Sequence, residues 1–190
     1  MPIQLIAAND LDLDESDRLF EEVDGQLVEM PPMSFFANWI AGRIFSRLDA
    51  YCTGTDFGFA TIECLFHLAM PVHRNRRPDV AVVSWRRWPK DRPLPRTGNA
   101  LDVTPNLMVE VISPTDLAEA VIEKVGEYFQ AGAEQVWLVY PSQSRLQIFA
   151  SPTSSRWLTR DDVIADLPFL PGFQFALREI FPEDPGATRS

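Results

Sequence analysis

The chain has 190 residues, of which 46% are apolar and 11% aromatic, and it carries a formal net charge of -10. These values exclude an intrinsically disordered chain, and because no apolar run reaches 18 residues we expect no membrane span. The acidic balance argues against a general nucleic-acid binder. The two cysteines have no metal or redox spacing and the N-terminus has no basic segment, so we expect a cytoplasmic protein. The length predicts one domain over residues 1–190.

Predicted helices and strands alternate along the chain. In chain order we expect a short helix at residues 14–23, a strand at 25–30, a helix at 34–52, one or two strands at 57–70, a buried strand at 78–84, a strand at 106–113, a helix at 116–131, a hairpin at 134–141 and 145–150, and short strands from 156 onwards. Residues 85–105 show no periodicity and contain four prolines, which indicates a loop that binds a partner or moves. Strands on both sides of the 116–131 helix predict a βαβ-like unit in a mixed sheet, and therefore a mixed α/β (α+β) fold.

The predicted helix at residues 116–131 has one lysine in its apolar stripe. Asp116 and Glu119 resemble a capping box at its start, and Gly132 follows its end. The stripe expected on the buried face consists of Leu117, Ala120, Val121, Val125, Tyr128 and Phe129, and the polar face of Glu119, Glu123, Glu127 and Gln130. Lys124, one of only two lysines in the chain, falls in the apolar series. Its ammonium therefore either reaches back to solvent or faces buried carboxylates.

Two acids interrupt strands that are otherwise apolar. Asp79 opens one predicted strand, and Glu110 is the single charge within the next predicted strand. A carboxylate is costly to bury without a cation, and the helix that follows the Glu110 strand presents Lys124 inward. Two carboxylates that lie close together can hold Mg²⁺ or Mn²⁺, and such a metal ion activates a water for attack on a phosphoryl group. The lysine would orient or deprotonate that water, or stabilise charge on the phosphate.

The chain resembles the Uma-type restriction endonuclease family, a branch of the PD-(D/E)XK nuclease superfamily, in three segments: "RPDVAVV", "LMVEVISPTD" and "EKVGEYFQAGAEQVWLVYP". The resemblance covers residues 15–182, with frayed ends outside it, and implies a restriction-endonuclease-like core with a central mixed β-sheet flanked by helices. It implies that Asp79 and Glu110 bind the metal. Ile112 stands where the superfamily's lysine usually is, so its main-chain carbonyl would be a metal ligand and Lys124 would supply the amine from the next helix.

The chain departs from the family pattern before this region. Many relatives carry a histidine near the start of the predicted helix at residues 34–52, where this chain reads "MPPMSFFANW". Glu29, at the end of the strand at 25–30, is a candidate further metal ligand. The alternative for Glu29 is a surface acid on an edge strand.

A basic window contrasts with the acidic remainder of the chain. Residues 73–97 hold eight basic residues against two aspartates, a local balance of +6, whereas the rest of the chain is at -16. A local basic patch suits a polyanion that must reach one site. The candidates for contacts with the DNA backbone are Arg74, Arg76, Arg77, Arg86 and Arg87. The alternative is a solvated loop with arginines at the surface.

These residues and the resemblance predict a Mg²⁺- or Mn²⁺-dependent DNA endonuclease, a hydrolase that cleaves phosphodiester bonds with Asp79, Glu110 and Lys124. The alternative is a catalytically inactive nuclease-fold protein that acts as a binding or assembly module. In a third interpretation Lys124 only neutralises Glu110, and Lys124→Met would then be neutral or stabilising. A double-strand cut needs two sites, so a homodimer is compatible with the leading hypothesis.

Overall fold

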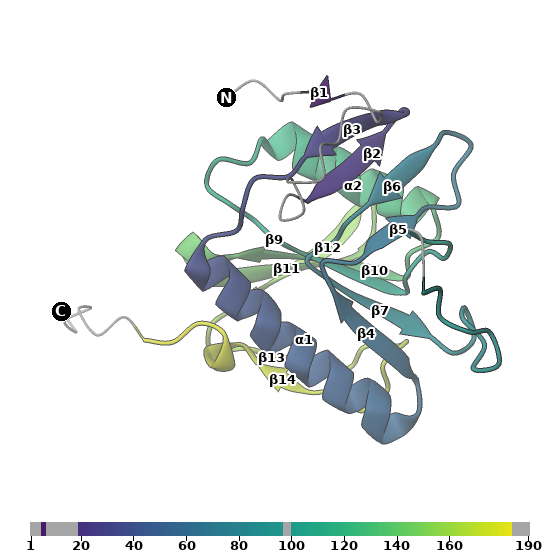
Figure 1. Cartoon of the computed structure of the whole chain (residues 1–190). Helices are drawn as coiled ribbons and strands as arrows, with labels where there is room; N and C mark the ends of the chain where they lie inside the picture. The colour runs from purple at the N-terminus through teal and green to yellow at the C-terminus, as the bar shows by residue number, and fades with distance from the viewer. Residues whose placement is uncertain (1–4, 7–18, 97–99, 184–190) are drawn as a thin grey trace.

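The computed structural model describes residues 5–6, 19–96 and 100–183 (Figure 1). Its helical elements are α1 (Phe35–Thr55), α2 (Ala118–Gln130) and the 3₁₀ turns η2 (Pro141–Gln143) and η3 (Leu177–Glu179). The strands are β1 (Leu5–Ile6), β2 (Phe20–Val23), β3 (Gln26–Glu29), β4 (Gly58–Ile62), β5 (Leu65–His67), β6 (Arg74–Arg76), β7 (Val80–Ser84), β8 (Ala100–Leu101), β9 (Leu107–Val111), β10 (Gln135–Tyr140), β11 (Arg145–Ser151), β12 (Ser154–Thr159), β13 (Val163–Ile164) and β14 (Phe175–Ala176).

A mixed six-stranded sheet, the central sheet, organises the fold in the order β12-β11-β10-β9-β7-β4. Its β9 and β10 are parallel and are joined by α2, whereas its other neighbouring strands are antiparallel. This arrangement confirms the predicted βαβ unit and the predicted hairpin of β10 and β11. A second sheet, the N-terminal sheet, has the order β1-β3-β2-β6-β5-β8. In Figure 1 the central sheet lies between α1 on one side and α2 with the N-terminal sheet on the other.

Alternation along β7 and β9 divides the buried residues into two cores. Val80, Val82, Leu107, Val109 and Val111 pack in the core on the α1 side of the central sheet, together with the segment around β14. The second core contains Ala81 and Val83 of β7 and Met108 of β9, and it packs against α2. Every residue of β7 and β9 is buried. The side of the sheet that faces α2 is therefore also the side to which Glu110 points.

Helix α1 agrees with its prediction. The side chain of Ser34 accepts a hydrogen bond from the amide of Ala37 and begins the helix, as an N-cap serine does. Of the stripe expected on this helix, Phe36, Ile40, Ile44 and Leu48, the last three are buried, whereas Phe36 is 40% exposed. No helix among the described residues combines the length and apolar character that a membrane span requires.

The N-terminal hairpin differs from its prediction. Residues 20–23, expected at the end of a short helix, form β2, which pairs with β3. Asp24 and Gly25 have φ angles of 54° and 75°, the left-handed pair that favours a two-residue turn between antiparallel strands. Hairpin pairing prevails there over the short helical pattern. The rest of that expected helix, residues 14–18, and both chain ends lie outside the described residues.

Helix α2 begins later than predicted, and its buried face agrees with the predicted stripe at Val125 and Tyr128 but differs at two positions. It starts at Ala118, and the Asp116 carboxylate accepts a hydrogen bond from the Ser113 amide instead of capping the helix. The expected capping box is therefore wrong. Leu117, placed in the buried stripe, is 70% exposed. Glu127, placed on the polar face, is buried, because arginines from β6 reach it.

Candidate functional site

Asp79 and Glu110 come from adjacent antiparallel strands and lie on the same face of the central sheet. Asp79 directly precedes β7, in which Val80 pairs with Val109 of β9. One further step in this register places Asp79 opposite Glu110, and residues in that relation have Cβ atoms about 4.5–5.5 Å apart. The amide of Val111 donates a hydrogen bond of 2.6 Å to the Asp79 carboxylate. Both acids are buried.

Helix α2 supplies two partners for Glu110. The Lys124 ammonium lies 3.1 Å from one oxygen of the Glu110 carboxylate, and the Tyr128 hydroxyl donates to the other oxygen at 2.5 Å. Lys124 and Tyr128 are four residues apart, so they share one face of the helix. Because α2 crosses over between β9 and β10, that face is brought against Glu110. The structure therefore brings Glu110 and Lys124 together, and it adds Tyr128, which the sequence placed among the apolar residues.

A third acid, Glu21 of β2, was missed by the sequence analysis. Its carboxylate lies 2.9 Å from the Lys124 ammonium and 2.7 Å from the Arg76 guanidinium. It also accepts a hydrogen bond of 2.9 Å from the Arg77 amide. The sequence assigned this segment to a helix, and a contact between β2 and α2 leaves no local pattern from which it could be predicted. Lys124 therefore lies between two carboxylates.

The electrostatics of the site follow from burial and from these contacts. Burial and then the neighbouring Glu110 carboxylate raise the pKa of Asp79 to about 8. Burial also raises the pKa of Glu110, although the Lys124 ammonium opposes the shift. For Glu21, burial opposes ionisation, but Lys124 and Arg76 hold its pKa below the usual value. Burial would lower the pKa of Lys124, but Glu110 and Glu21 more than offset it and raise that pKa. Lys124 is therefore a fixed positive charge at neutral pH.

The donor set around Asp79 and Glu110 fits a small divalent cation. Two buried carboxylates that repel each other are stabilised by such an ion, and Mg²⁺ is commonly bound by one or two carboxylates together with waters and substrate phosphate. Within the described ranges, no group of three or more histidine, cysteine, aspartate and glutamate side chains is arranged to hold a metal ion. Metal binding by Asp79 and Glu110 stays a prediction.

The two other proposed ligands have different placements. Ile112 follows β9 and donates its amide to the Val139 carbonyl, which continues the pairing with β10; metal binding by its own carbonyl stays a prediction. Glu29 pairs with Phe20 in the β2–β3 register. Side chains alternate along a strand, so Glu29 lies on the opposite face of the hairpin from Glu21. Its role as a ligand also stays a prediction.

Arg74, Arg76 and Arg77, from the first part of the basic window, are engaged within the protein. Arg74 lies in a buried ion pair with Glu127 at 3.1 Å. Arg76 bridges Glu127 and Glu21. Arg77 donates to the main-chain carbonyls of residues 20 and 63. The guanidiniums of Arg74 and Arg76 join the N-terminal sheet to α2 through Glu127, so both are engaged away from the expected common surface for a polyanion.

Arg86 and Arg87 follow the opposite end of β7. Arg87 donates to the main-chain carbonyls of residues 104, 105 and 132 and holds the ends of neighbouring segments together. Arg86 contacts Glu134 at 3.1 Å, and its side chain is 80% exposed. Of the five predicted arginines, Arg86 is therefore the most accessible to a polyanion. DNA contact by these arginines stays a prediction.

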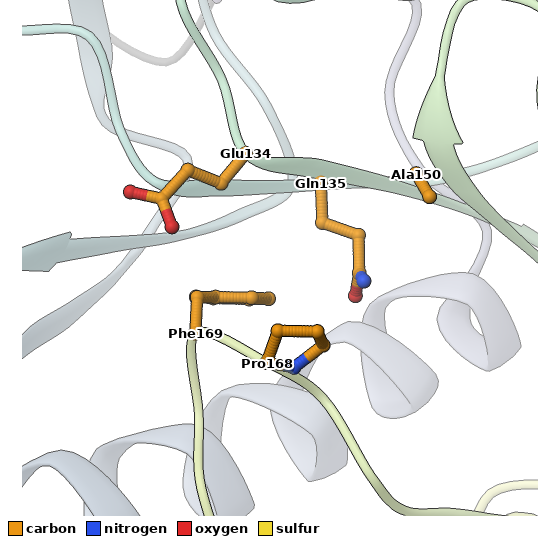
Figure 2. Close-up of a pocket in the computed structure, with 5 residues that line it drawn as sticks. All are labelled: Glu134, Gln135, Ala150, Pro168 and Phe169. Atoms are coloured by element: carbon orange, nitrogen blue, oxygen red, sulfur yellow. The ribbon is translucent and has the colours of Figure 1, made fainter.

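A pocket of about 280 Å³ lies elsewhere in the fold (Figure 2). It is lined by Glu134, Gln135, Ala150, Pro168 and Phe169. Figure 2 shows the Gln135 side chain directed toward the segment at residues 168–169. In the β9–β10 register Gln135 pairs with Leu107 and Leu138 pairs with Glu110, so the pocket begins three residues, roughly 10 Å, along the strand from the acids. Alternation also places Gln135 on the α1 face, so the pocket does not belong to the candidate site.

Known proteins share this architecture. A crystal structure described as "a putative nuclease belonging to DUF820" from Anabaena variabilis ATCC 29413 matches with a TM-score of 0.73 and 16% identity, over 85% of this chain and 89% of that chain. This likeness shows a restriction-endonuclease-like nuclease fold. No curated protein matches the chain. The Uma2 family, described as "Putative restriction endonuclease", matches residues 7–178. As the sequence motifs implied, the chain belongs to the Uma2 family of nucleases.

Proposed function

We propose that this nuclease-family protein is a metal-dependent DNA endonuclease that hydrolyses phosphodiester bonds with an activated water. The observation that carries the proposal is the contact between Glu110 and Lys124 directly across from Asp79. Asp79 and Glu110 would hold Mg²⁺ or Mn²⁺. When bound, the ion would polarise a phosphoryl oxygen and lower the pKa of a bound water. Membership of the Uma2 family supports DNA as the substrate.

The side chains of this site have distinct roles in the proposal. Because two acids raise its pKa, Lys124 acts as a cation that orients the water or stabilises charge on the phosphate, and does not take up a proton. Tyr128 fixes the rotamer of Glu110 by its hydrogen bond. The Val111 amide does the same for Asp79. The protein thus preorganises the site before substrate arrives.

Plasmid nicking tests the proposal. Purified wild type, Asp79→Ala and Lys124→Ala would be compared in Mg²⁺ and then in Mn²⁺, with Glu119→Gln on the exposed side of α2 as the control. We expect cleavage by the wild type and the control and none by the two site variants. Equal cleavage by Asp79→Ala would contradict the site, and no cleavage by any protein in either metal would contradict the activity on duplex DNA.

One observation favours the alternative of a binding or assembly module without catalysis. Both oxygens of Glu110 are already engaged, one by Lys124 and the other by Tyr128. If these contacts persist, Glu110 would be a poor metal ligand. Calorimetric titration with Mn²⁺ separates the two functions, because a catalytic site binds the ion through Asp79 and Glu110 whereas a purely structural cluster does not.

The cellular setting and assembly belong to the same proposal. Cys52 and Cys64 are both free thiols, which suits the reducing cytoplasm. Cleavage of both strands needs two sites, so we expect a homodimer to form at least on DNA. Sedimentation of the protein with and without a duplex measures its oligomeric state. A protein that cuts both strands but stays a monomer on the duplex would contradict the expectation.

A further inference from the structure

We infer that Glu21 is a positioning residue for the proposed reaction, because its carboxylate, carried by the N-terminal hairpin, holds the Lys124 ammonium against Glu110. The catalytic consequence rests on the proposed function, whereas the positioning itself rests on the contacts. Lys124 is bound from two sides, by Glu110 of β9 at 3.1 Å and by Glu21 of β2 at 2.9 Å. A lysine is a point charge on a flexible stem, so one carboxylate would leave it free to swing and two restrict it.

Glu21 is itself fixed by a closed ring of contacts. One carboxylate oxygen lies 2.7 Å from the Arg76 guanidinium, and the other accepts from the Arg77 amide at 2.9 Å as well as from Lys124. Arg76 reaches Glu127 at 2.6 Å. Glu127 lies on α2 three residues after Lys124, so the ring closes through the helix. Glu21 is buried, and its position is set before any substrate arrives.

The same contacts argue against Glu21 as a metal ligand. Its two oxygens face two cationic side chains and an amide, which leave it little capacity to coordinate a further cation. The adjacent Glu22 offers a matched control, because its side chain alternates to the other face of β2. There it accepts a hydrogen bond of 2.7 Å from the Asn75 amide group and lies 3.1 Å from His73. Glu22 thus shares the strand and the residue type of Glu21 and also accepts a side-chain hydrogen bond, but it lacks the contact with Lys124.

The chain has only two lysines, which makes the position of Lys124 measurable without an activity assay. Labelling with ¹⁵N-lysine gives two ammonium resonances in an NMR spectrum. Lys90 pairs with Asp56 at the surface, so its protons should exchange with water rapidly, whereas those of Lys124 should exchange slowly. In Glu21→Gln we expect the Lys124 ammonium signal to broaden and its exchange to accelerate at least tenfold. Glu22→Gln should leave it unchanged.

The catalytic arm compares kcat and KM for the same variants on plasmid DNA. Loss of a residue that orients a catalytic group costs about 10- to 100-fold in activity, so Glu21→Gln should lower kcat in that range with KM little changed. Glu22→Gln should keep both values. If Glu21→Gln does not fold, Glu21→Asp serves instead, because it keeps the charge toward Arg76 but is one methylene too short to hold Lys124 as well.

The outcomes separate this inference from the proposed function. An unchanged Lys124 signal in a folded Glu21 variant overturns the positioning, whatever the activity. A mobile Lys124 with undiminished kcat overturns the catalytic consequence. A wild type that cleaves nothing contradicts the proposed function, while the NMR comparison still decides whether Glu21 holds Lys124. Weaker Mn²⁺ binding by Glu21→Gln with a rigid Lys124 would make Glu21 a ligand and also overturn the inference.

Discussion

Asp79 and Glu110 face each other across β7 and β9, two buried acids whose strands continue the same antiparallel register. Each makes the ionisation of the other less favourable, since like charges in a poorly solvated site repel. The fold accepts this arrangement at a cost in stability, as proteins commonly do where a site is prepared for a ligand. The first two predictions follow from that cost.

Asp79→Asn should stabilise the metal-free protein at alkaline pH. The pKa of Asp79 is raised to about 8 in the folded protein, against about 4 in an unfolded chain. Between these values the folded protein retains a proton that the unfolded chain releases, so the contribution to stability is complete below pH 4 and is lost as pH rises through 8, by up to about 1.4 kcal/mol per pH unit. Asparagine cannot ionise. Urea unfolding in EDTA from pH 5 to 9 should therefore show a flatter curve for the variant, and parallel curves would contradict the prediction.

A divalent cation should make the wild type more stable than Asp79→Asn. Mg²⁺ or Mn²⁺ bound to the folded state alone would stabilise it by about 2.7 kcal/mol at a concentration 100 times the dissociation constant. We expect thermal unfolding of the wild type at pH 8 to shift upward with either ion, and no shift for Asp79→Asn or Glu110→Gln. Glu29→Gln tests Glu29, the other acid proposed as a metal ligand. An unchanged response removes Glu29 from the ligand set, whereas a lost response would add it.

Lys124→Met should destabilise the protein, whereas the interpretation in which Lys124 only neutralises Glu110 expects a neutral or stabilising effect. Its removal leaves Glu21 and Glu110 buried without their shared cation, and breaking a buried pair in this way typically costs about 3–5 kcal/mol. The cost should fall as the pH falls, because burial raises the pKa of Glu110 and favours its uptake of a proton. The chain's other lysine is the control, because Lys90 forms a surface pair and such pairs contribute about 0–1 kcal/mol. Equal unfolding free energies for the two variants would sink the prediction.

The arginines of the basic window should separate into two classes. Arg86→Ala should leave the unfolding free energy unchanged but weaken DNA binding at all sequences, with the slope of log affinity against log salt reduced by about 1. Arg76→Ala should instead destabilise the fold, because it removes the cation between Glu21 and Glu127. Fluorescence anisotropy with a labelled duplex at several salt concentrations measures the first effect. A salt slope that Arg86→Ala does not alter would exclude Arg86 from the interface.

Regular local patterns made most of the fold predictable. The alternation around Glu110 and the apolar run of β7 placed both strands, and the periodicity of α1 placed its buried face. Predictions failed where long-range contacts decide the outcome. Residues 20–23 pair as a hairpin because β6 and β3 lie beside them. Within the expected loop at 85–105, residues 100 and 101 form β8 because β5 offers a partner.

The candidate site shows the same division. Glu110 and Lys124 belong to one βαβ unit, and the lysine in an apolar stripe was a local signal of a buried partner. Glu21 and Tyr128 gave no such signal, because a tyrosine suits an apolar face and a glutamate on a hairpin suits solvent. The partners of the arginines could not be predicted for a related reason: a count of charges along the chain cannot reveal that Arg74 and Arg76 form ion pairs with Glu127.

The ring through Glu21 also has a consequence for how the protein folds and opens. Lys124 and Glu110 are 14 residues apart, so their contact closes a short loop, whereas Glu21 must close a loop on the order of 100 residues, at a higher entropic cost. Local contacts form first, so we expect the hairpin to dock onto a βαβ unit that is already in place. Undocking of the hairpin alone would release Lys124 while the central sheet stays folded. The fraction of molecules with Lys124 held in place would then be set by the equilibrium between the docked and the undocked hairpin. Hydrogen exchange of the β2 amides would measure this equilibrium.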